Sequence, residues 1–303
     1  MRGIFVDGTE ELAAVFHRVA RPDDPEIRVN IARQVEPDEL PGVLSGTQFV
    51  LNDRTFMPTD AMRRCQGLHH VVFLGTGVRS YMHPEELAGA GITVHTIRGY
   101  GDAAVAEHAI ALMWSAARSV VAMDRSIRVG GWPHTEGVQL TGKTIGLLGF
   151  GGIAAEVARI AGGSGMRVLA WNRTPRTPPG VRFVDLDTLL AESDVLSLHL
   201  LLTEATRGIL SAGRLARLRP GAILVNTARG ALVDENAMVA GLRSGAIRHA
   251  ALDVFATEPL PAGHALTTLP NVTLSAHSAF RTPEASETLL RRALDIAKQL
   301  ATE

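Results

Sequence analysis

"TIGLLGFGGIAAEVARIAGG", residues 144–163, is the stretch of sequence that decides the fold. An apolar run typical of a buried strand leads into a glycine-rich turn, and a pattern of small and apolar residues typical of a helix follows. Gly149 permits the tight turn, Gly151 allows the backbone to approach a ligand closely, and Ala154 lets the helix pack on the strand. Gly152 adds freedom to the turn. The stretch therefore predicts the first strand, turn and helix of a dinucleotide-binding fold.

A second glycine-rich stretch, "GVQLTGKT" at residues 137–144, matches the pattern of a triphosphate-binding P-loop. A P-loop needs a strand before it and a helix N-terminus after it, because the helix holds the phosphates. Here a strand follows Lys143 directly. We interpret this stretch as a polar turn, and a nucleoside triphosphatase becomes a distant alternative.

Short β-rich runs alternate with helical patterns along the chain, which is typical of doubly wound α/β folds. We expect two parallel-sheet lobes: a Rossmann dinucleotide-binding domain, residues 99–281, inserted in a discontinuous flavodoxin-like substrate domain, residues 1–98 plus 282–303. Strands are predicted at RGIFVD, QFVLND, HHVVFL and ITVHTI, and then at TIGLLGF, RVLAWN, RFVD, VLSLHL, AILVNTA, HAALDVF and VTLSAH. Helices are predicted at 58–68, at 103–123 with Asp102 as the N-cap after a hinge at Gly99 and Gly101, and at 282–303, where the helix should pack back on the first lobe.

The composition indicates an ordinary globular protein, with 46% hydrophobic and 20% charged residues and a formal net charge of −1. A general nucleic-acid surface would need a basic excess, so no nucleic-acid partner is expected. Cys65 is the only cysteine, which excludes an internal disulfide framework and favours a reducing compartment. With no secretory signal and no bilayer-long apolar run, we expect a cytoplasmic protein without a membrane partner. No metal site is predicted.

Ionisable and polar residues follow several of the later strands. They are His199, then Thr227 and Arg229 with Ala228 between them, then Asp253 with Glu258 in the loop beyond, and finally His277. Ligands of open α/β sheets bind outside the carboxyl ends of the strands, so these side chains should meet at one crevice.

Three of these residues suit the reduction of a 2-oxo acid by a nicotinamide cofactor. The Arg229 guanidinium can bind a carboxylate through two parallel hydrogen bonds and polarise the adjacent carbonyl. His277 can donate the proton to the developing alkoxide, and Glu258 can favour the imidazolium form of that histidine. Singly, each has an ordinary structural explanation; together at one sheet edge they indicate a dehydrogenase.

The loop "WNRTPRT", residues 171–177, bears on the choice of cofactor. Asn172 lies about 20 residues beyond Gly151, where an acid would hydrogen-bond the ribose of NAD and repel a 2′-phosphate. Asn172 does not repel that phosphate, and Arg173, Thr174 and Arg176 could bind it. NADP is therefore favoured, with NAD as the alternative if the arginines are only loop charges.

The chain resembles the D-isomer-specific 2-hydroxyacid dehydrogenases, of the glyoxylate and hydroxypyruvate reductase type, over almost its whole length. The resemblance is carried, in order, by GTGV, VAEHAIAL, LTGKTIGLLGFGGIA, LLAESDVLSLHLLLTEATRGIL, VNTARGALVDENAM, ALDVFATEPLP and NVTLSAHSAF, which begin at residues 75, 105, 140, 189, 225, 251 and 271. It implies a homodimer and a catalytic set of Arg229, Glu258 and His277. It also implies that Asp253 holds the nicotinamide carboxamide, and that His108 is structural.

The same resemblance implies a substrate loop at Gly75, Thr76 and Gly77, whose amides meet the substrate carboxylate. The residues expected to bind the cofactor are Gly149, Gly151, Gly152, Ile153, Asn172, Arg173, Thr174, His199, Thr227, Ala228 and Asp253. Trp132 falls where relatives have a dimer contact near the active site, although core packing would explain it equally well.

The chain departs from the family pattern at Arg79, Arg98 and Leu201, which replace an acid and two prolines. The two arginines could favour a substrate with a second anionic group or could simply be solvated. Phe73 stands where phosphoglycerate dehydrogenases commonly have an arginine, so glyoxylate or hydroxypyruvate is the leading expectation. A phosphoglycerate dehydrogenase-like enzyme and a non-catalytic, corepressor-like dinucleotide-binding protein are the alternatives.

Overall fold

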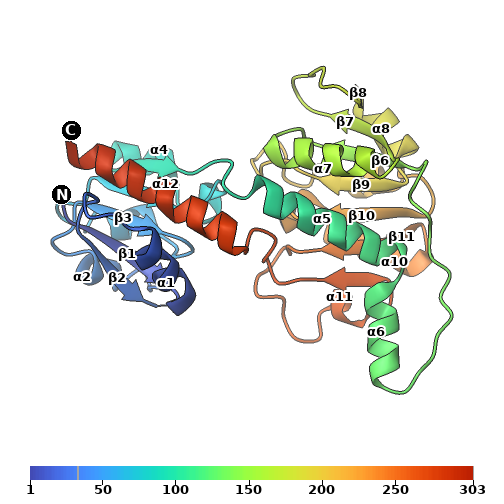
Figure 1. The fold of residues 1–303 in the computed structure, drawn as a ribbon, viewed down its shortest axis with the longest axis horizontal. Coiled ribbons are helices and arrows are strands. Elements are labelled where there is room, and N and C mark those ends of the chain that lie inside the picture. The colour runs from blue at the N-terminus through green and yellow to red at the C-terminus, as the bar shows by residue number, and fades with distance from the viewer. Residues whose placement is uncertain (33, 303) are drawn as a thin grey trace. The chain divides into compact units, whose positions relative to one another are not determined.

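The computed structural model describes residues 1–32 and 34–302, which form two compact units (Figure 1). Unit 1 comprises Met1–Gly101 with Arg281–Glu303, and unit 2 comprises Asp102–Phe280. The assignment of a substrate-binding role and a dinucleotide-binding role to two domains with the boundaries given above stays a prediction. No helix of the described chain is both long and apolar enough to cross a membrane.

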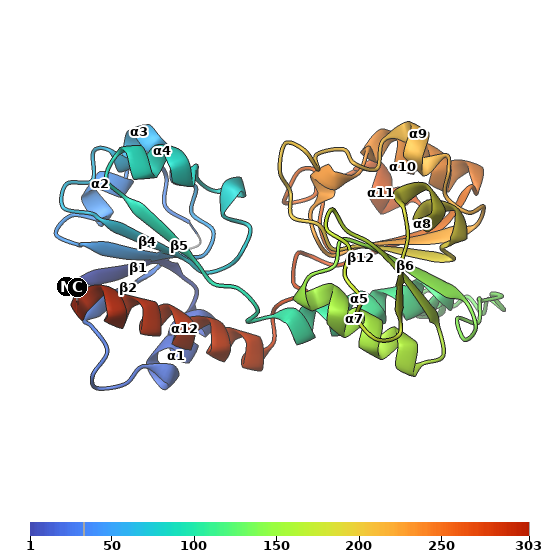
Figure 2. The same cartoon turned by 90° about the horizontal axis from the view of Figure 1, so that it is seen from above.

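Unit 1 is built on a five-stranded parallel sheet with the order β2-β1-β3-β4-β5, the doubly wound order of flavodoxin-like folds. The strands are β1 (Gly3–Gly8), β2 (Ile27–Ile31), β3 (Phe49–Asn52), β4 (His70–Phe73) and β5 (Thr93–Thr96). Figure 2 shows α1 (Glu10–Val19) and α12 (Pro283–Thr302) on one face of this sheet. The other face carries α2 (Leu40–Val43), α3 (Thr59–Met62) and α4 (Pro84–Gly89).

Unit 2 is built on a seven-stranded parallel sheet with the order β12-β11-β10-β9-β6-β7-β8. The strands are β6 (Thr144–Leu148), β7 (Arg167–Trp171), β8 (Val181–Phe183), β9 (Val195–Leu198), β10 (Ala222–Asn226), β11 (Ile247–Leu252) and β12 (Val272–Leu274). Read from β8, this is the Rossmann order, in which the direction of winding reverses between β6 and β9. The predicted α/β class with two doubly wound sheets is confirmed.

The helices of unit 2 cover both faces of its sheet (Figure 2). One face is packed by α5 (Asp102–Ala117) and α7 (Gly152–Gly163), and the other by α8 (Leu186–Glu192), α9 (Ala212–Leu215), α10 (Glu235–Ser244) and α11 (Ala265–Thr268). Both faces of the central strands are therefore apolar, which explains why β6 and β10 are continuous hydrophobic runs.

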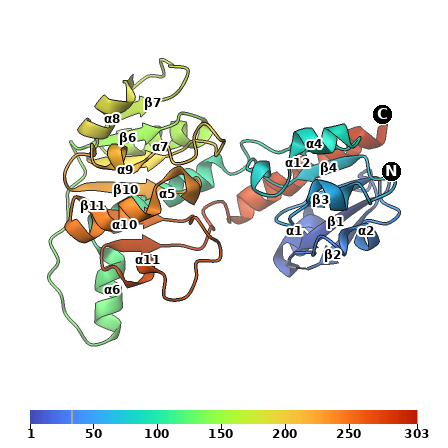
Figure 3. The ribbon, with the colours of Figure 1, turned by 180° about the vertical axis from the view of Figure 1, so that it is seen from behind.

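Three features differ from the elements predicted. The single helix expected over 103–123 begins at Asp102 and ends at Ala117, because Ser119 takes a left-handed φ of 54°, and α6 (Val120–Arg128) begins after it. Figure 3 shows α6 leading into a long irregular segment that returns to β6. The helix expected over 58–68 is one turn, α3, followed by tight turns. The helix α1 and the half-exposed edge strand β2 were not predicted.

The C-terminal helix α12 packs on α1 and on the sheet of unit 1. Its apolar face supplies Leu289, Leu290, Ala293, Leu294, Ala297 and Leu300 to the core on that side. The Arg291 guanidinium donates to both carboxylate oxygens of Asp24 at 2.7 Å and to the Val19 carbonyl at 2.9 Å. The helix is thus part of the core of unit 1 rather than an appendage.

Candidate active site

The glycine-rich turn after β6 requires each of its glycines for a different reason. Gly149 takes a φ of 97°, and a Cβ placed there would lie 2.8 Å from the His199 carbonyl oxygen. A Cβ on Gly152 would lie 1.8 Å from a carboxylate oxygen of Asp102. Gly151 differs, because a Cβ there would meet nothing within 4 Å. The first two glycines allow the turn to close, whereas Gly151 leaves open space beside the N-terminus of α7.

Two unsatisfied features of unit 2 fit a phosphate-containing ligand. Gly151 is the N-cap of α7 and offers no side chain to the free N–H groups of the first turn, which contains Ile153. Thr227, which follows β10, has a buried hydroxyl without a hydrogen-bond partner in the described chain. Helix N-terminal amides and hydroxyl groups bind phosphate oxygens, so these residues fit the pyrophosphate of a dinucleotide.

Asn172 joins the end of β7 to the glycine-rich turn. Its Oδ1 accepts from the Phe150 amide at 3.4 Å, and its Nδ2 donates to the Thr174 carbonyl at 3.0 Å. Arg173, Thr174 and Arg176 are exposed, and neither arginine forms an ion pair within residues 1–32 and 34–302. The loop therefore offers two positive charges, and the side chain of Asn172 is already held by backbone groups.

His199, at the end of β9, is held as a neutral imidazole. Its Nε2 lies 2.9 Å from the Ser197 hydroxyl. Burial lowers the pKa of His199 to about 4. The ring therefore adds no charge beside the glycine-rich turn at neutral pH. Ala228, in the next loop, donates its amide to the Asn226 side chain at 3.0 Å.

The structure brings His277 and Glu258 into direct contact. The His277 Nδ1 lies 2.6 Å from Glu258 Oε2, and the Phe255 amide donates to Glu258 Oε1 at 2.9 Å. Burial would raise the pKa of Glu258, but these two hydrogen bonds and the charges of His277 and Arg229 outweigh it and lower that pKa. Glu258 is thus an ionised acceptor for the imidazole ring.

Arg229 lies in the loop after β10, which packs against the loop that carries Glu258. A Cβ on Gly230 would lie 2.0 Å from the Phe255 carbonyl carbon, so only glycine allows this approach. The Arg229 carbonyl accepts from Asn226 Nδ2 at 2.9 Å, and one guanidinium nitrogen donates to the Ala228 carbonyl at 2.7 Å. The predicted arginine, glutamate and histidine therefore lie on neighbouring loops at one edge of the sheet.

Asp253 organises the turn that carries His277. Its carboxylate is fully buried and accepts from the Ser275 hydroxyl at 2.6 Å and from the Ser278 and Ala279 amides at 3.0 and 2.9 Å. Its carbonyl accepts from the His277 amide at 2.8 Å. Ser275 was not singled out from the sequence, because a serine two residues before a histidine has no signal of its own. The predicted contact of Asp253 with a carboxamide stays a prediction.

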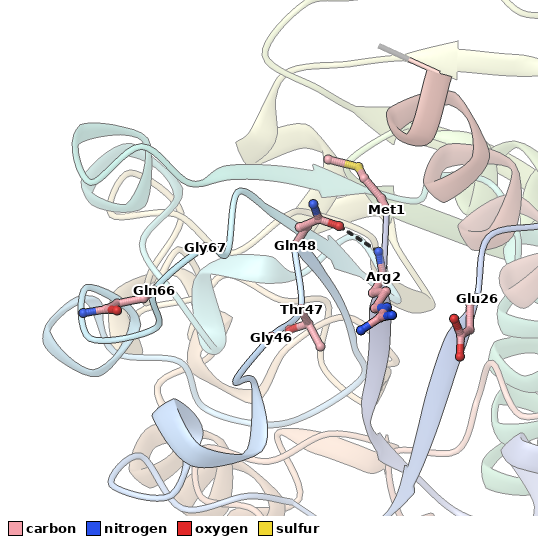
Figure 4. Close-up of a pocket in the computed structure, with 8 residues that line it drawn as sticks. All are labelled: Met1, Arg2, Glu26, Gly46, Thr47, Gln48, Gln66 and Gly67. Carbon is pink, nitrogen blue, oxygen red and sulfur yellow. Dashed lines mark hydrogen bonds between the residues drawn. The ribbon is translucent and has the colours of Figure 1, made fainter.

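A hollow of unit 1 lies away from the predicted chemistry. It lies at the N-terminal ends of β1 to β4 and is lined by Met1, Arg2, Glu26, Gly46, Thr47, Gln48, Gln66 and Gly67 (Figure 4). The figure shows the Arg2 amide donating to Gln48 Oε1, at 2.8 Å, across its floor. None of the predicted site residues lines it.

Comparison with known proteins agrees with this geometry. Residues 110–279 match the model of the NAD-binding domain of D-isomer-specific 2-hydroxyacid dehydrogenases. The chain is 33% identical to a glycerate dehydrogenase of Methylorubrum extorquens over 269 residues, 86% of this chain and 84% of the relative. The chain belongs to the D-isomer-specific 2-hydroxyacid dehydrogenase family.

Two further relatives place the dehydrogenase within that family. It is 42% identical to a glyoxylate reductase of Aeropyrum pernix over 223 residues, 69% of this chain and 66% of the relative. A solved acyclic imino acid reductase, Bsp5, in complex with NADPH and D-Arg superposes with a TM-score of 0.87 at 28% identity, covering 100% of this chain and 98% of that one. The predicted family and the prediction of an enzyme are confirmed, and the dehydrogenase uses a nicotinamide cofactor.

The predicted substrate loop of the dehydrogenase, Gly75 to Gly77, follows β4 in unit 1. The Gly75 amide donates to the Phe73 carbonyl at 2.8 Å, and its carbonyl accepts from the Ile97 amide at 3.1 Å. Within residues 1–32 and 34–302, the amides of Thr76 and Gly77 donate to no acceptor. Two free amides in sequence are suited to bind an anionic group.

Proposed function

We propose that this dehydrogenase reduces a small 2-oxo acid, glyoxylate or hydroxypyruvate, and prefers NADPH to NADH. The observation that carries the catalytic part is the 2.6 Å contact between His277 Nδ1 and Glu258 Oε2, on a loop that packs against the loop of Arg229. The relatives named as reductases of such acids support the substrate class.

Each of the three side chains has one chemical task in this proposal. Glu258 accepts a hydrogen bond from Nδ1–H of His277, which keeps Nδ1 protonated and leaves Nε2–H as the transferable proton. The bound cofactor supplies the hydride. The Nε2 proton of His277 passes to the developing alkoxide oxygen, and the ring becomes neutral with Nδ1–H retained. Arg229 binds the substrate carboxylate and stabilises the charge that develops on the adjacent oxygen.

The cofactor is held, in this proposal, by the glycine-rich turn and the strand ends of unit 2. The residues are Gly149, Gly151, Gly152, Ile153, Asn172, Arg173, Thr174, His199, Thr227, Ala228 and Asp253. The exposed guanidinium groups of Arg173 and Arg176, which form no ion pair with any described residue, and the lack of a carboxylate at Asn172 support NADPH. The solved relative that binds NADPH adds support.

The substrate is small in this proposal because Phe73 and Arg79, which flank the substrate loop in the sequence, leave no free charge for a second anionic group. Phe73 is buried and stacks on Tyr81 with ring centroids 5.2 Å apart. Arg79 pairs with Glu85. The amides of Thr76 and Gly77 are left to bind a single carboxylate.

Parallel assays of NADPH and NADH consumption test the proposal. Hydroxypyruvate, glyoxylate, pyruvate, 2-oxoisocaproate and 3-phosphohydroxypyruvate are offered separately, and we expect the first two with NADPH to react fastest. His277→Ala should abolish turnover and leave NADPH binding, measured by calorimetry, unchanged. Turnover by His277→Ala would contradict the proton-donor assignment. A preference for 3-phosphohydroxypyruvate would favour the phosphoglycerate dehydrogenase-like alternative.

The cofactor preference has its own variants. Arg173→Ala should raise KM for NADPH by about tenfold, with KM for NADH unchanged, because only NADPH carries the 2′-phosphate. Arg182→Ala, at an exposed arginine paired with Glu192, is the matched control and should alter neither constant. An equal rise in KM for NADPH and for NADH would show that Arg173 does not bind the 2′-phosphate.

We also propose a homodimer formed through α6 and the segment after it. None of the α6 residues is buried. Three apolar side chains of α6 and the segment after it, Ile127, Val129 and Trp132, are 52%, 85% and 77% exposed. A second copy would cover these side chains. Sedimentation equilibrium should give a dimer for the wild type and a monomer for Ile127→Asp with Trp132→Ser. Phe56→Asp, at an exposed phenylalanine of unit 1, should stay dimeric, and a monomeric wild type would refute the proposal.

A further inference from the structure

A line of three side chains runs beneath the turn that carries His277. His108 on α5 places Nε2 2.9 Å from the Ser275 hydroxyl, which lies 2.6 Å from Asp253 Oδ1. His108 Nε2 is also 3.5 Å from that Asp253 oxygen. Helix α5 and the ends of β11 and β12 are thus joined by one polar network within unit 2.

The direction of each hydrogen bond follows from the chemistry of Asp253. Burial would raise its pKa, but hydrogen bonds from His108, Ser275 and two backbone amides outweigh burial and lower it. An ionised carboxylate only accepts, so Ser275 uses its single proton to donate to Asp253. The Ser275 oxygen then accepts from His108, and His108 carries its proton on Nε2.

The network ends on the backbone that sets the orientation of His277. Asp253 holds the amides of Ser278 and Ala279 through its carboxylate and the amide of His277 through its carbonyl. His277 takes a left-handed φ of 49°, which is costly for a residue with a Cβ and persists only when the surroundings impose it. The Asp253 carboxylate therefore anchors the turn, and its own position is held by the hydrogen bonds from Ser275 and His108.

We propose that His108 is a positioning residue for proton transfer, which acts through Ser275 and Asp253 on the His277 turn. This inference rests on the proposed role of His277. Loss of the donor at His108 leaves Ser275 free to rotate and Asp253 short of a partner. The His277 ring then loses its alignment with Glu258 and the substrate, whereas the glycine-rich turn and the loop of Asn172, which hold the cofactor in the proposed function, lie outside the network.

Four variants test the role of His108. His108→Leu and Ser275→Ala remove a donor and should lower kcat about tenfold, as expected for loss of a hydrogen bond in a network that ends on a charge. KM for NADPH should change by less than about threefold. His108→Gln places an amide N–H near the position of Nε2 and should recover most of the lost kcat. Ser275→Thr keeps the hydroxyl and should behave like the wild type.

The chain offers a matched control on the same two strands. His249 on β11 lies 2.9 Å from the Thr273 hydroxyl on β12, a similar pair that does not touch Asp253. His249→Leu should lower the melting temperature and leave kcat within about twofold of the wild type. If His249→Leu lost as much kcat as His108→Leu at a similar melting temperature, the effect would be general destabilisation and the inference would fail.

A spectroscopic readout tests the inference without turnover. In protein labelled with ¹⁵N-histidine, the His277 ring signal is assigned by its loss in His277→Ala. This signal should shift in His108→Leu and Ser275→Ala and stay in place in His249→Leu. An unshifted signal would overturn the inference. If the wild type reduced no 2-oxo acid but the signal shifted as expected, the proposed function would fail and the positioning network would stand.

Discussion

At the scale of the residue, Gly230 is a position where the site admits no side chain. The loop of Arg229 can approach the loop of Glu258 only because Gly230 has no side chain to meet the Phe255 carbonyl. Phe255 in turn donates its amide to Glu258. A single missing Cβ thus sets the spacing between the proposed carboxylate-binding and proton-transfer groups.

Gly230→Ala should therefore lower kcat/KM about a hundredfold, because one loop must move to admit the methyl group. Overpacking of this kind costs about 1–3 kcal/mol of stability, which the fold can bear. Gly213→Ala is the matched control, since a Cβ there would meet nothing within 4 Å. Steady-state kinetics with denaturation curves check both variants. Wild-type kcat/KM in Gly230→Ala would mean that the loop spacing is unimportant.

The residues proposed to do the chemistry could be predicted from the sequence, whereas the contacts that hold them in place were predicted less well. Arg229, Glu258 and His277 follow strands, and strand ends of a parallel sheet converge, so their grouping was expected. The Ser275 hydroxyl, the free Thr227 hydroxyl and the Asn172 contacts depend on how loops fold back on one another. No periodicity in the sequence encodes such contacts.

At the scale of the element, two strands of unit 2 each carry or end at a histidine that is neutral in the fold. Burial lowers the pKa of His199 and of His249 to about 4, with the charge of Arg248 adding to the effect on His249. In the unfolded chain both titrate near about 6.5. Between these values the unfolded state binds more protons, so stability is full above about pH 6.5 and falls as pH decreases toward about 4.

Unit 2 should accordingly lose stability on acidification from about pH 7.5 to about pH 5, by about 2 kcal/mol for His249 alone. His249→Gln should flatten this loss by a similar amount. Urea unfolding followed by tryptophan fluorescence reports the stability of unit 2 selectively, because Trp114, Trp132 and Trp171 all lie in unit 2. A variant with the wild-type pH dependence would show that His249 is not held neutral.

Elements were predictable where burial dominates and less so where local geometry decides. Every strand of unit 2 was expected, and β6, β9 and β10 most clearly, because they are nearly continuous apolar runs covered on both faces. The edge strand β2 alternates polar and apolar residues and carries no such signal. The helix breaks at Ser119 because this one residue has a left-handed backbone conformation, and the apolar pattern around it does not predict that conformation.

At the scale of the whole molecule, unit 1 depends on residues from both ends of the sequence. The side chains of Asp24 and Arg291 are only 4% and 16% exposed, and their pair joins the loop after α1 to α12. Hydrogen bonds from Arg291 lower the pKa of Asp24, so the pair stabilises unit 1 at neutral pH and loses this effect as pH falls below about 4.

Arg291→Met should lower the unfolding free energy of unit 1 by about 3 kcal/mol, because Asp24 is left as a buried, unpaired charge. Arg18→Met removes a pair of exposed side chains with Glu287 and should cost less than about 1 kcal/mol. Scanning calorimetry resolves the transition of unit 1 in both variants. If both variants lost less than about 1 kcal/mol of unfolding free energy, the pair of Asp24 and Arg291 would behave like an exposed surface pair.

The insertion of unit 2 into unit 1 has a consequence during synthesis on the ribosome. Unit 2 is continuous in sequence and can fold as it emerges, whereas the sheet face that contains Phe5, Phe49 and Leu51 is covered only in part, by α1, until α12 arrives. At about 5–20 residues per second, that delay lasts on the order of ten seconds or more. For that time the nascent chain presents an apolar sheet face to the cell, a surface that a chaperone can shield until the last helix closes it.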